Sequence, residues 1–283
     1  MEIVVADNAG VCFGVKRALE LAVRALEGKS RPVYTLGPLI HNPQEIARLE
    51  GMGMRSATSL DEITGGAVVL PAHGVDPKVE SEARERGLEV IDATCPFVRR
   101  AQRHTHALAE AGYAVVILGD PGHREVEGLA AQAAGKARIV TGAREAEGLA
   151  FAPRYGLVVQ TTQRPETLRE VAGALAGRCR QLRVLNTLCE ATVSRQRSAR
   201  SLAEKAEVMI VVGGRNSANT ARLREICAAA GAPAYHIETA RELEAEWVRG
   251  AQKVGVTGGA STPEWVMKEV VARLRELASE AAS

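Results

Sequence analysis

The sequence predicts an α/β fold of three lobes, a pseudo-threefold trefoil of repeated small α/β units with mostly parallel sheets around a shared centre. Cys12, Cys95 and Cys189 each stand where an apolar strand ends and a helix begins. The number of residues from one of these cysteines to the next is similar in all three cases, if the count from Cys189 continues past the C-terminus to the N-terminus and on to Cys12. Strands alternate with helices throughout, which favours parallel sheets. We therefore expect one unit repeated three times, with the last unit borrowing its final strand from the N-terminus.

Each unit is predicted to contain the same elements in the same order. A cysteine helix leads to a short apolar strand at residues 33–36, 115–118 and 208–212. A second apolar strand with its polar loop occupies residues 67–74, 156–163 and 253–261. A further helix begins near Pro77, Pro165 and Pro263. The returning strand reaches the next cysteine, at residues 3–6, 88–91 and 182–185. The predicted domains are residues 13–95, 96–189 and 190–283, the last completed by residues 1–12.

Composition excludes several classes of protein. A net charge of +2 and only 3% aromatic residues argue against a nucleic-acid partner. No apolar run approaches the ~20 residues of a membrane span, and the N-terminus lacks the pattern of a signal peptide. The cysteine count of 5 is odd, which argues against a disulfide framework. We expect a cytoplasmic protein in which Cys179 and Cys227 have structural roles.

Three thiols at matching repeat positions indicate a metal site. Helix N-termini stabilise thiolates, and thiolates select zinc or iron–sulfur clusters. Structural zinc sites use closely spaced ligand pairs, which these cysteines lack. Three cysteines on a four-iron cluster would leave one iron open for catalysis. Zinc with a fourth histidine ligand stays open at this stage.

Polar side chains gather in the predicted strand-end loops. Hydrogen-bond donors in glycine-rich loops before helices suit an anion, especially phosphate. The donors are His41, His73, His123, Thr161, Thr162, Ser217, Asn219 and Ser261. No nucleotide P-loop motif is present. Glu125 follows in the same kind of loop and is interpreted either as a helix cap or as a proton donor.

With these residues assembled, the chain closely resembles the 4-hydroxy-3-methylbut-2-enyl diphosphate reductases, the LytB/IspH family, last enzymes of the non-mevalonate isoprenoid pathway. The matching motifs are GVCFGVKRA, IHN, AHGV, DATCP, GHREVEG, QTT, CEATVSRQ, VVGGRNSANT and TGGASTP. They span nearly the whole chain in the family's order, which makes the resemblance specific. It implies a trefoil around a [4Fe–4S] cluster held by Cys12, Cys95 and Cys189.

The resemblance also implies roles for the polar residues. The substrate diphosphate would be held by His41, His73, Ser217, Asn219 and Ser261, with His123 nearby. Thr161 and Glu125 would handle the substrate hydroxyl and protons. Two departures from the family are Ala218, where many relatives carry serine, and Arg124, where proline is common. The implied reaction is reductive removal of an allylic hydroxyl, giving isopentenyl and dimethylallyl diphosphates.

The implied partners are the diphosphate substrate and an external electron donor: ferredoxin, flavodoxin or an NADPH-linked reductase. Two alternatives belong to other classes. A non-catalytic iron–sulfur or zinc protein that senses redox state predicts a closed site and needs no anion clamp. A cluster-free phosphosugar enzyme that uses histidines as acid and base leaves the three cysteines unexplained.

Overall fold

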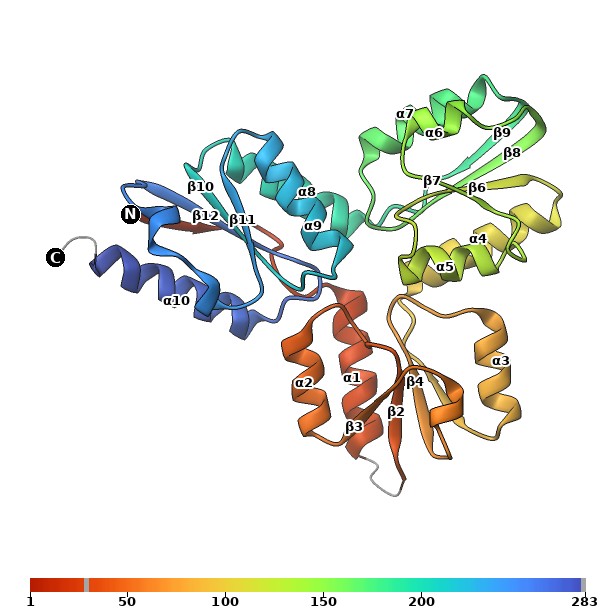
Figure 1. The fold of residues 1–283 in the computed structure, drawn as a ribbon, viewed down its shortest axis with the longest axis horizontal. Coiled ribbons are helices and arrows are strands. Elements are labelled where there is room, and N and C mark those ends of the chain that lie inside the picture. The colour runs from red at the N-terminus through yellow and green to blue at the C-terminus, as the bar shows by residue number, and fades with distance from the viewer. Residues whose placement is uncertain (28–30, 281–283) are drawn as a thin grey trace. The chain divides into compact units, whose positions relative to one another are not determined.

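The protein, seen in a computed structural model, contains three four-stranded sheets flanked by helices (Figure 1). The structure describes residues 1–27 and 31–280. Within these ranges every pair of neighbouring strands is parallel. The predicted fold class, three α/β lobes with parallel sheets, is confirmed.

The first lobe follows Cys12. Its elements are α1 (Phe13–Glu27), β2 (Val33–Leu36), α2 (Pro43–Gly51), β3 (Met54–Ala57), the 3₁₀ turn η1 (Leu60–Glu62), β4 (Ala67–Leu70), α3 (Pro77–Glu85) and β5 (Glu89–Asp92). The strand order in the sheet is β3-β2-β4-β5.

The second lobe follows Cys95. Its elements are α4 (Pro96–Glu110), β6 (Ala114–Leu118), α5 (Arg124–Ala131), β7 (Arg138–Val140), α6 (Ala143–Glu147), β8 (Ala152–Val159), α7 (Pro165–Ala176) and β9 (Cys179–Leu185). The strand order is β7-β6-β8-β9, which repeats the first lobe. Both β8 and β9 begin before the residues predicted for them. The first residues of both strands include exposed arginines, Arg154 in β8 and Arg180 in β9, so no continuous apolar run marks the start of either strand.

The third lobe follows Cys189 and is completed by the N-terminus. Its elements are α8 (Glu190–Ala203), β10 (Val208–Val212), α9 (Ala218–Ala229), β11 (Ala234–Ile237), the 3₁₀ turns η2 (Ala240–Glu242) and η3 (Ala245–Val248), β12 (Lys253–Gly258), α10 (Glu264–Glu280) and β1 (Glu2–Val5). The strand order is β1-β12-β10-β11, the same topology read from the other edge. β1 pairs in parallel with β12, from Glu2 opposite Lys253 to Val5 opposite Val256. The residue boundaries proposed for the three repeats stay a prediction.

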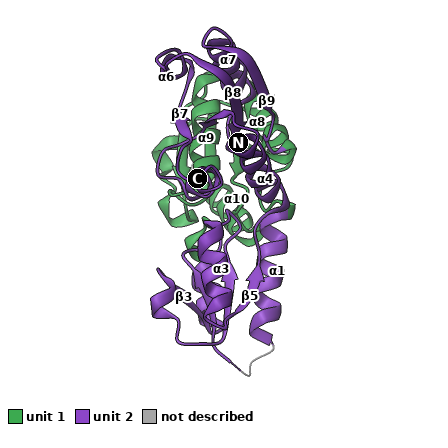
Figure 2. Ribbon diagram, turned by 90° about the vertical axis from the view of Figure 1, so that its right-hand side faces the viewer, with its two compact units in different colours: residues 1–13, 41–45, 190–283 green, residues 14–40, 46–189 purple. Residues whose placement is uncertain are grey.

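The chain divides into two compact units (Figure 2). Unit 1 is residues 1–13, 41–45 and 190–283; unit 2 is residues 14–40 and 46–189. Unit 1 therefore holds the third sheet together with the short segment 41–45. Unit 2 holds the first two sheets. No helix in the described part of the chain combines the length and apolar character needed to cross a membrane.

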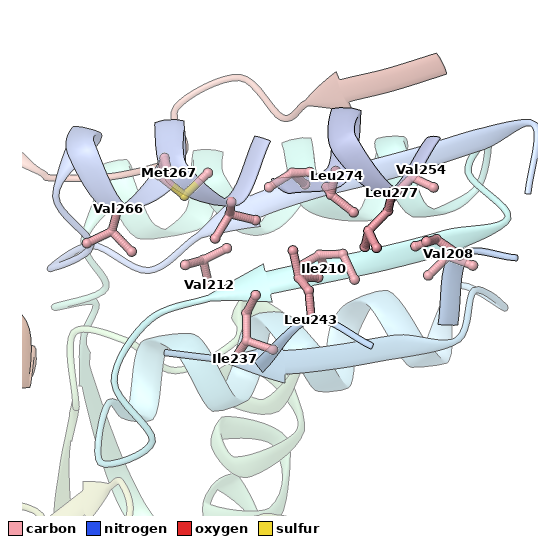
Figure 3. Close-up of a cluster of buried hydrophobic side chains, with 13 residues drawn as sticks. Val208, Ile210, Val212, Ile237, Leu243, Val254, Val266, Met267, Leu274 and Leu277 are labelled. Carbon is pink, nitrogen blue, oxygen red and sulfur yellow. The ribbon is translucent and has the colours of Figure 1, made fainter. Parts of the chain in front are cut away.

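Alternate residues of the central strands pack on opposite faces of each sheet. In unit 1, Val208, Ile210 and Val212 of β10 contribute to the apolar cluster that contains the α10 side chains (Figure 3). Met209 and Val211, between them, pack with side chains of α8 and α9. Burial on both faces explains why the central strands are continuous apolar runs. Because both faces of each sheet are covered, we expect the functional site in the polar loops at the carboxyl ends of the strands.

Candidate functional site

Each of the three predicted cysteine ligands makes the same kind of backbone hydrogen bond. Each cysteine N–H donates to a carbonyl oxygen in the loop after the neighbouring strand: Cys12 to Ala260 (3.0 Å), Cys95 to Ala72 (2.9 Å) and Cys189 to Thr161 (3.0 Å). Each cysteine immediately precedes a helix, respectively α1, α4 and α8. All three are half-buried free thiols. The repeat thus places each of the three cysteines directly before a helix.

The three thiols are divided between the two units. Cys12 lies in unit 1, whereas Cys95 and Cys189 lie in unit 2. Within the described residues of either unit, no three histidine, cysteine, aspartate or glutamate side chains form a metal-binding group. The donor chemistry nevertheless fits an iron–sulfur cluster, because three unbridged, partly buried thiols offer soft ligands and leave a fourth position open. The three-cysteine site stays a prediction.

The other two cysteines have structural surroundings. Cys179 opens β9, and its thiol donates to the Leu175 carbonyl oxygen at 3.3 Å. Cys227 is fully buried in α9 beside Ala199. Burial raises the pKa of the Cys227 thiol to about 12, so this cysteine stays protonated near neutral pH.

Glu125 and Thr161 form a buried pair in unit 2. The Thr161 N–H donates to Glu125 Oε1 at 2.7 Å, and the Thr161 hydroxyl donates to Oε2 at 2.9 Å. Both residues are more than nine-tenths buried. Burial raises the pKa of Glu125 to about 7, against the opposing effect of the two hydrogen bonds from Thr161. Glu125 is therefore a carboxyl group that can hold or release a proton near neutral pH.

The pair is connected to a predicted metal ligand. The carbonyl oxygen of Thr161 accepts the hydrogen bond from the Cys189 N–H. Thr161 thus contacts the carboxyl group through its side chain and the cysteine loop through its backbone. One residue therefore positions both the carboxyl group of Glu125 and the loop of Cys189.

His123 is the cap of the helix that carries Glu125. Its Nδ1 accepts the Glu125 N–H at 3.1 Å, at the start of α5. His123, and not Glu125, is therefore the residue that caps α5. The carboxyl group of Glu125 accepts its hydrogen bonds from Thr161. Because Nδ1 accepts, its neutral form carries the proton on Nε2.

Three residues near Glu125 were missed by the sequence analysis. Gln160 Oε1 accepts the Asp120 N–H at 2.8 Å, and Gln163 Nε2 donates to Asp120 Oδ1 at 3.1 Å. The fixed Asp120 carboxylate adds to the effect of burial in raising the pKa of Glu125. The only available signal was that Gln160 is the first residue of the QTT motif, that Gln163 follows this motif, and that Asp120 lies two residues before GHREVEG.

Four predicted anion-binding residues lie in unit 1: His41, Ser217, Asn219 and Ser261. Ser217 caps α9 by accepting the Thr220 N–H, and Ser261 donates to the His41 carbonyl oxygen at 3.0 Å. Asn219 is 5% exposed, yet neither its amide nitrogen nor its amide oxygen has a hydrogen-bond partner within the described residues. A buried amide with both ends unsatisfied is costly, which points to a polar ligand.

The backbone around Asn219 is shaped for close approach. A Cβ on Gly214 would lie 2.5 Å from the His41 carbonyl oxygen, so only glycine fits there. Asn42, next to His41, was not singled out from the sequence. Its side chain accepts the Glu45 N–H, while its own amide nitrogen is buried without a partner in the described structure. Its signal was the IHN motif.

His73 belongs to unit 2. It is 8% exposed and its Nδ1 is 3.0 Å from the Gly74 carbonyl oxygen. It lines a cavity of about 470 Å³ together with Gly74, Asp76 and Arg124. The departure from the family at Arg124 therefore places a cation on the wall of the cavity that His73 lines.

Comparison with known proteins gives one family. The family model described as "LytB protein" matches residues 3–275. A protein of Geobacter sulfurreducens named 4-hydroxy-3-methylbut-2-enyl diphosphate reductase is 48% identical over 276 residues, which cover 98% of each chain. A protein of Aquifex aeolicus with the same name is 43% identical over 280 residues, covering 98% of this chain and 97% of its own.

Solved structures agree with these relatives. One is titled (E)-4-hydroxy-3-methyl-but-2-enyl diphosphate reductase, the terminal enzyme of the non-mevalonate pathway. It is 42% identical with a TM-score of 0.71, and the match covers 98% of this chain and 100% of that one. The reductase from Plasmodium falciparum is 26% identical with a TM-score of 0.91, over 96% of this chain and 87% of that one.

Proposed function

Because the chain belongs to the LytB family, we propose that it is an oxidoreductase that acts as its relatives are named, a 4-hydroxy-3-methylbut-2-enyl diphosphate reductase. The proposed reaction removes the allylic hydroxyl group as water. It consumes two electrons and two protons and yields isopentenyl or dimethylallyl diphosphate. The observation that carries the proposal is the buried Glu125–Thr161 pair, hydrogen-bonded to the loop of Cys189.

The cofactor assigned to Cys12, Cys95 and Cys189 is a [4Fe–4S] cluster. Three soft thiols at helix starts suit it, and no fourth cysteine stands at a matching repeat position. When bound, the cluster would relay electrons from an external donor and would act as a Lewis acid. Cys12, Cys95 and Cys189 would hold it.

Glu125 is the proposed proton source and Thr161 the group that hands the proton on. In its protonated form Glu125 can donate to the Thr161 hydroxyl, which then turns its own proton toward the leaving oxygen. A pKa of about 7 keeps a large share of Glu125 protonated at neutral pH. A proton donor with a pKa near the working pH is the most effective kind.

The diphosphate end is assigned to unit 1. Ser217, Asn219 and the start of α9 offer an anion a side-chain amide and a helix N-terminus together. His41 and Ser261 of unit 1 belong to the proposed clamp, and the resemblance to the family adds His73 of unit 2, with His123 nearby. Such a clamp would fix the substrate so that its hydroxyl group meets the proton source.

Anaerobic purification followed by iron, sulfide and zinc analysis tests the proposal. We expect iron and sulfide near four atoms per chain, and conversion of the diphosphate substrate when a chemically reduced viologen supplies electrons. Zinc in place of iron, or iron–sulfur protein that binds no diphosphate substrate, would favour a non-catalytic redox or sensor protein. Ferredoxin, flavodoxin or an NADPH-linked reductase as the natural donor, and a cytoplasmic location, stay predictions.

A further inference from the structure

The loop that precedes Cys12 is held by an arginine from the helix that follows Cys189. Arg195, on α8, donates from Nε to the Asn8 carbonyl oxygen at 2.9 Å and from Nη2 to the Gly10 carbonyl oxygen at 2.8 Å. Arg195 is 3% exposed. Its guanidinium group thus bridges two carbonyl groups within the four residues before the cysteine.

The loop that precedes Cys95 is held in the same way. Arg17, on the helix that follows Cys12, donates from Nη1 to the Thr94 carbonyl oxygen at 3.2 Å and from Nη2 to the Asp92 carbonyl oxygen at 3.3 Å. No carboxylate in the described part of the chain forms an ion pair with Arg17. Two arginines on successive cysteine helices therefore make the same kind of contact, each inside one unit.

The Cys12 loop needs such support because its backbone is irregular. Asn8 has φ of 61° and Gly10 has φ of 97°, both in the left-handed region. Carbonyl groups in such a loop have no strand partner and must find donors elsewhere. A planar guanidinium can satisfy two of them at once and fix their separation, which a lysine ammonium cannot do as well.

Among the described residues, no arginine makes this contact with the third loop, which precedes Cys189. Arg100 stands five residues after Cys95, as Arg17 stands five after Cys12. Its Nε is buried without a hydrogen-bond partner in the described structure, and its guanidinium lies over the Phe97 ring. The Cys189 loop is held instead by the Thr187 hydroxyl, which accepts the Val159 N–H at 3.0 Å. Two cysteine loops are held by a cation and one by a neutral hydroxyl.

We propose that Arg17 and Arg195 are positioning residues that fix the Cys95 and Cys12 loops for cluster binding and supply positive charge that favours the reduced cluster. The inference rests on the proposed function. Each guanidinium contacts carbonyl groups within the four residues before one cysteine, so it brings a fixed positive charge to that cysteine's loop. Adding an electron makes the cluster more negative, which a nearby fixed cation favours.

The test compares Arg17→Gln, Arg17→Lys and Arg195→Gln with two control variants. Arg100→Gln is the control at the matching repeat position, and Arg197→Gln changes an exposed arginine on the same helix as Arg195. Three quantities are measured on the anaerobically purified full chain. They are hydrogen exchange of the cysteine-loop amides, the rate of iron release to a chelator, and the reduction potential.

Arg17→Gln and Arg17→Lys should both speed exchange in residues 92–95 and not in residues 8–12, and should speed iron release about 10-fold. Arg195→Gln should speed hydrogen exchange in residues 8–12 and not in residues 92–95. Arg17→Gln should lower the reduction potential, whereas Arg17→Lys, which keeps the charge, should restore most of it. The two control variants should match the wild type.

Exchange and potential in the Arg17 variants that equal those of Arg100→Gln would overturn the inference. Should Arg195→Gln fail to fold, the two Arg17 variants still decide it, because Arg17 is only half-buried. Wild-type protein without iron would count against the proposed function. In that case loop exchange alone still judges the positioning role.

Discussion

Unit 1 and unit 2 place different chemistry at the carboxyl ends of their strands. Unit 1 presents neutral hydrogen-bonding groups around the start of α9, among them the buried and unpartnered amide of Asn219. Unit 2 presents a carboxyl group, Glu125, fully engaged with Thr161. The proposed function gives equivalent loops of one repeated fold different tasks: one would receive an anion and the other would store a proton.

The difference lies in how each buried polar group is satisfied. In unit 2 both carboxylate oxygens of Glu125 accept hydrogen bonds from Thr161, so the Glu125–Thr161 pair can exist without substrate. In unit 1 the Asn219 amide lacks a protein partner among the described residues, so its hydrogen bonds are available only to a ligand. Changes in unit 1 should therefore affect substrate affinity, and changes in unit 2 should affect turnover.

The largest effect is expected from removing the cofactor on which both units would act. Cys12→Ser, Cys95→Ser and Cys189→Ser should each lose most of the bound iron and all detectable activity, because serine is a poor ligand for a cluster. Cys179→Ser is the matched control, since its thiol only donates to a helix carbonyl. Iron analysis and an activity assay check this. Normal iron and activity in any of the first three would remove that cysteine from the site.

Glu125→Gln tests the unit 2 side directly. Glutamine keeps the size and much of the hydrogen bonding but cannot deliver a proton, so turnover should fall by about 10²–10⁴-fold. Substrate should still bind and perturb the cluster spectrum. Glu127→Gln, an exposed carboxylate on the same helix, is the control. A turnover number near the wild-type value would show that the proton comes from elsewhere.

Burial of Glu125 also predicts a pH dependence of stability. Its pKa is about 7 in the folded protein and 4.5 when unfolded, so the folded state holds the proton more tightly. The resulting stabilisation is complete below about pH 4.5 and is lost as pH rises through 7, a change of about 3 kcal/mol. Denaturant unfolding of wild type and Glu125→Gln from pH 5 to 9 measures it. The two curves should diverge as pH rises, and parallel curves would contradict the raised pKa.

Much of this comparison could be predicted from the sequence, and the reasons are local. The strand-to-helix position of each cysteine follows from the apolar runs and helix patterns beside it. The contact between Glu125 and Thr161 joins residues 36 apart, and periodicity gives no signal for such a pair. Sequence periodicity also could not show that segment 41–45 packs with residues 190–283. The hydrogen bond from the Ser261 hydroxyl to the His41 carbonyl oxygen forms only through tertiary packing.

Asn219→Ala and His41→Ala test the unit 1 side. Each removes a proposed hydrogen bond to a charged ligand, so the apparent affinity for substrate should fall by roughly 10- to 100-fold. Iron content and the cluster spectrum should stay unchanged. Asn216→Ala alters an exposed amide in the same loop and is the control. Unchanged affinity in both variants, with the cofactor intact, would rule out the diphosphate clamp.

The smallest effect is expected at Ala218, the first residue of α9. Ala218→Ser adds one hydroxyl beside Ser217 and Asn219, at the helix N-terminus proposed to receive the diphosphate. One added hydrogen bond should lower KM by less than about 10-fold, because a competing bond to water is given up at the same time. kcat and the pH profile should not move, since Ala218 makes no contact in the Glu125–Thr161 pair. Steady-state kinetics of this variant, compared with Ala221→Ser one turn along the helix, separates a contact with the ligand from a general effect on α9. A lower kcat with unchanged KM would place Ala218 outside the anion site and would break the division of tasks between the two units.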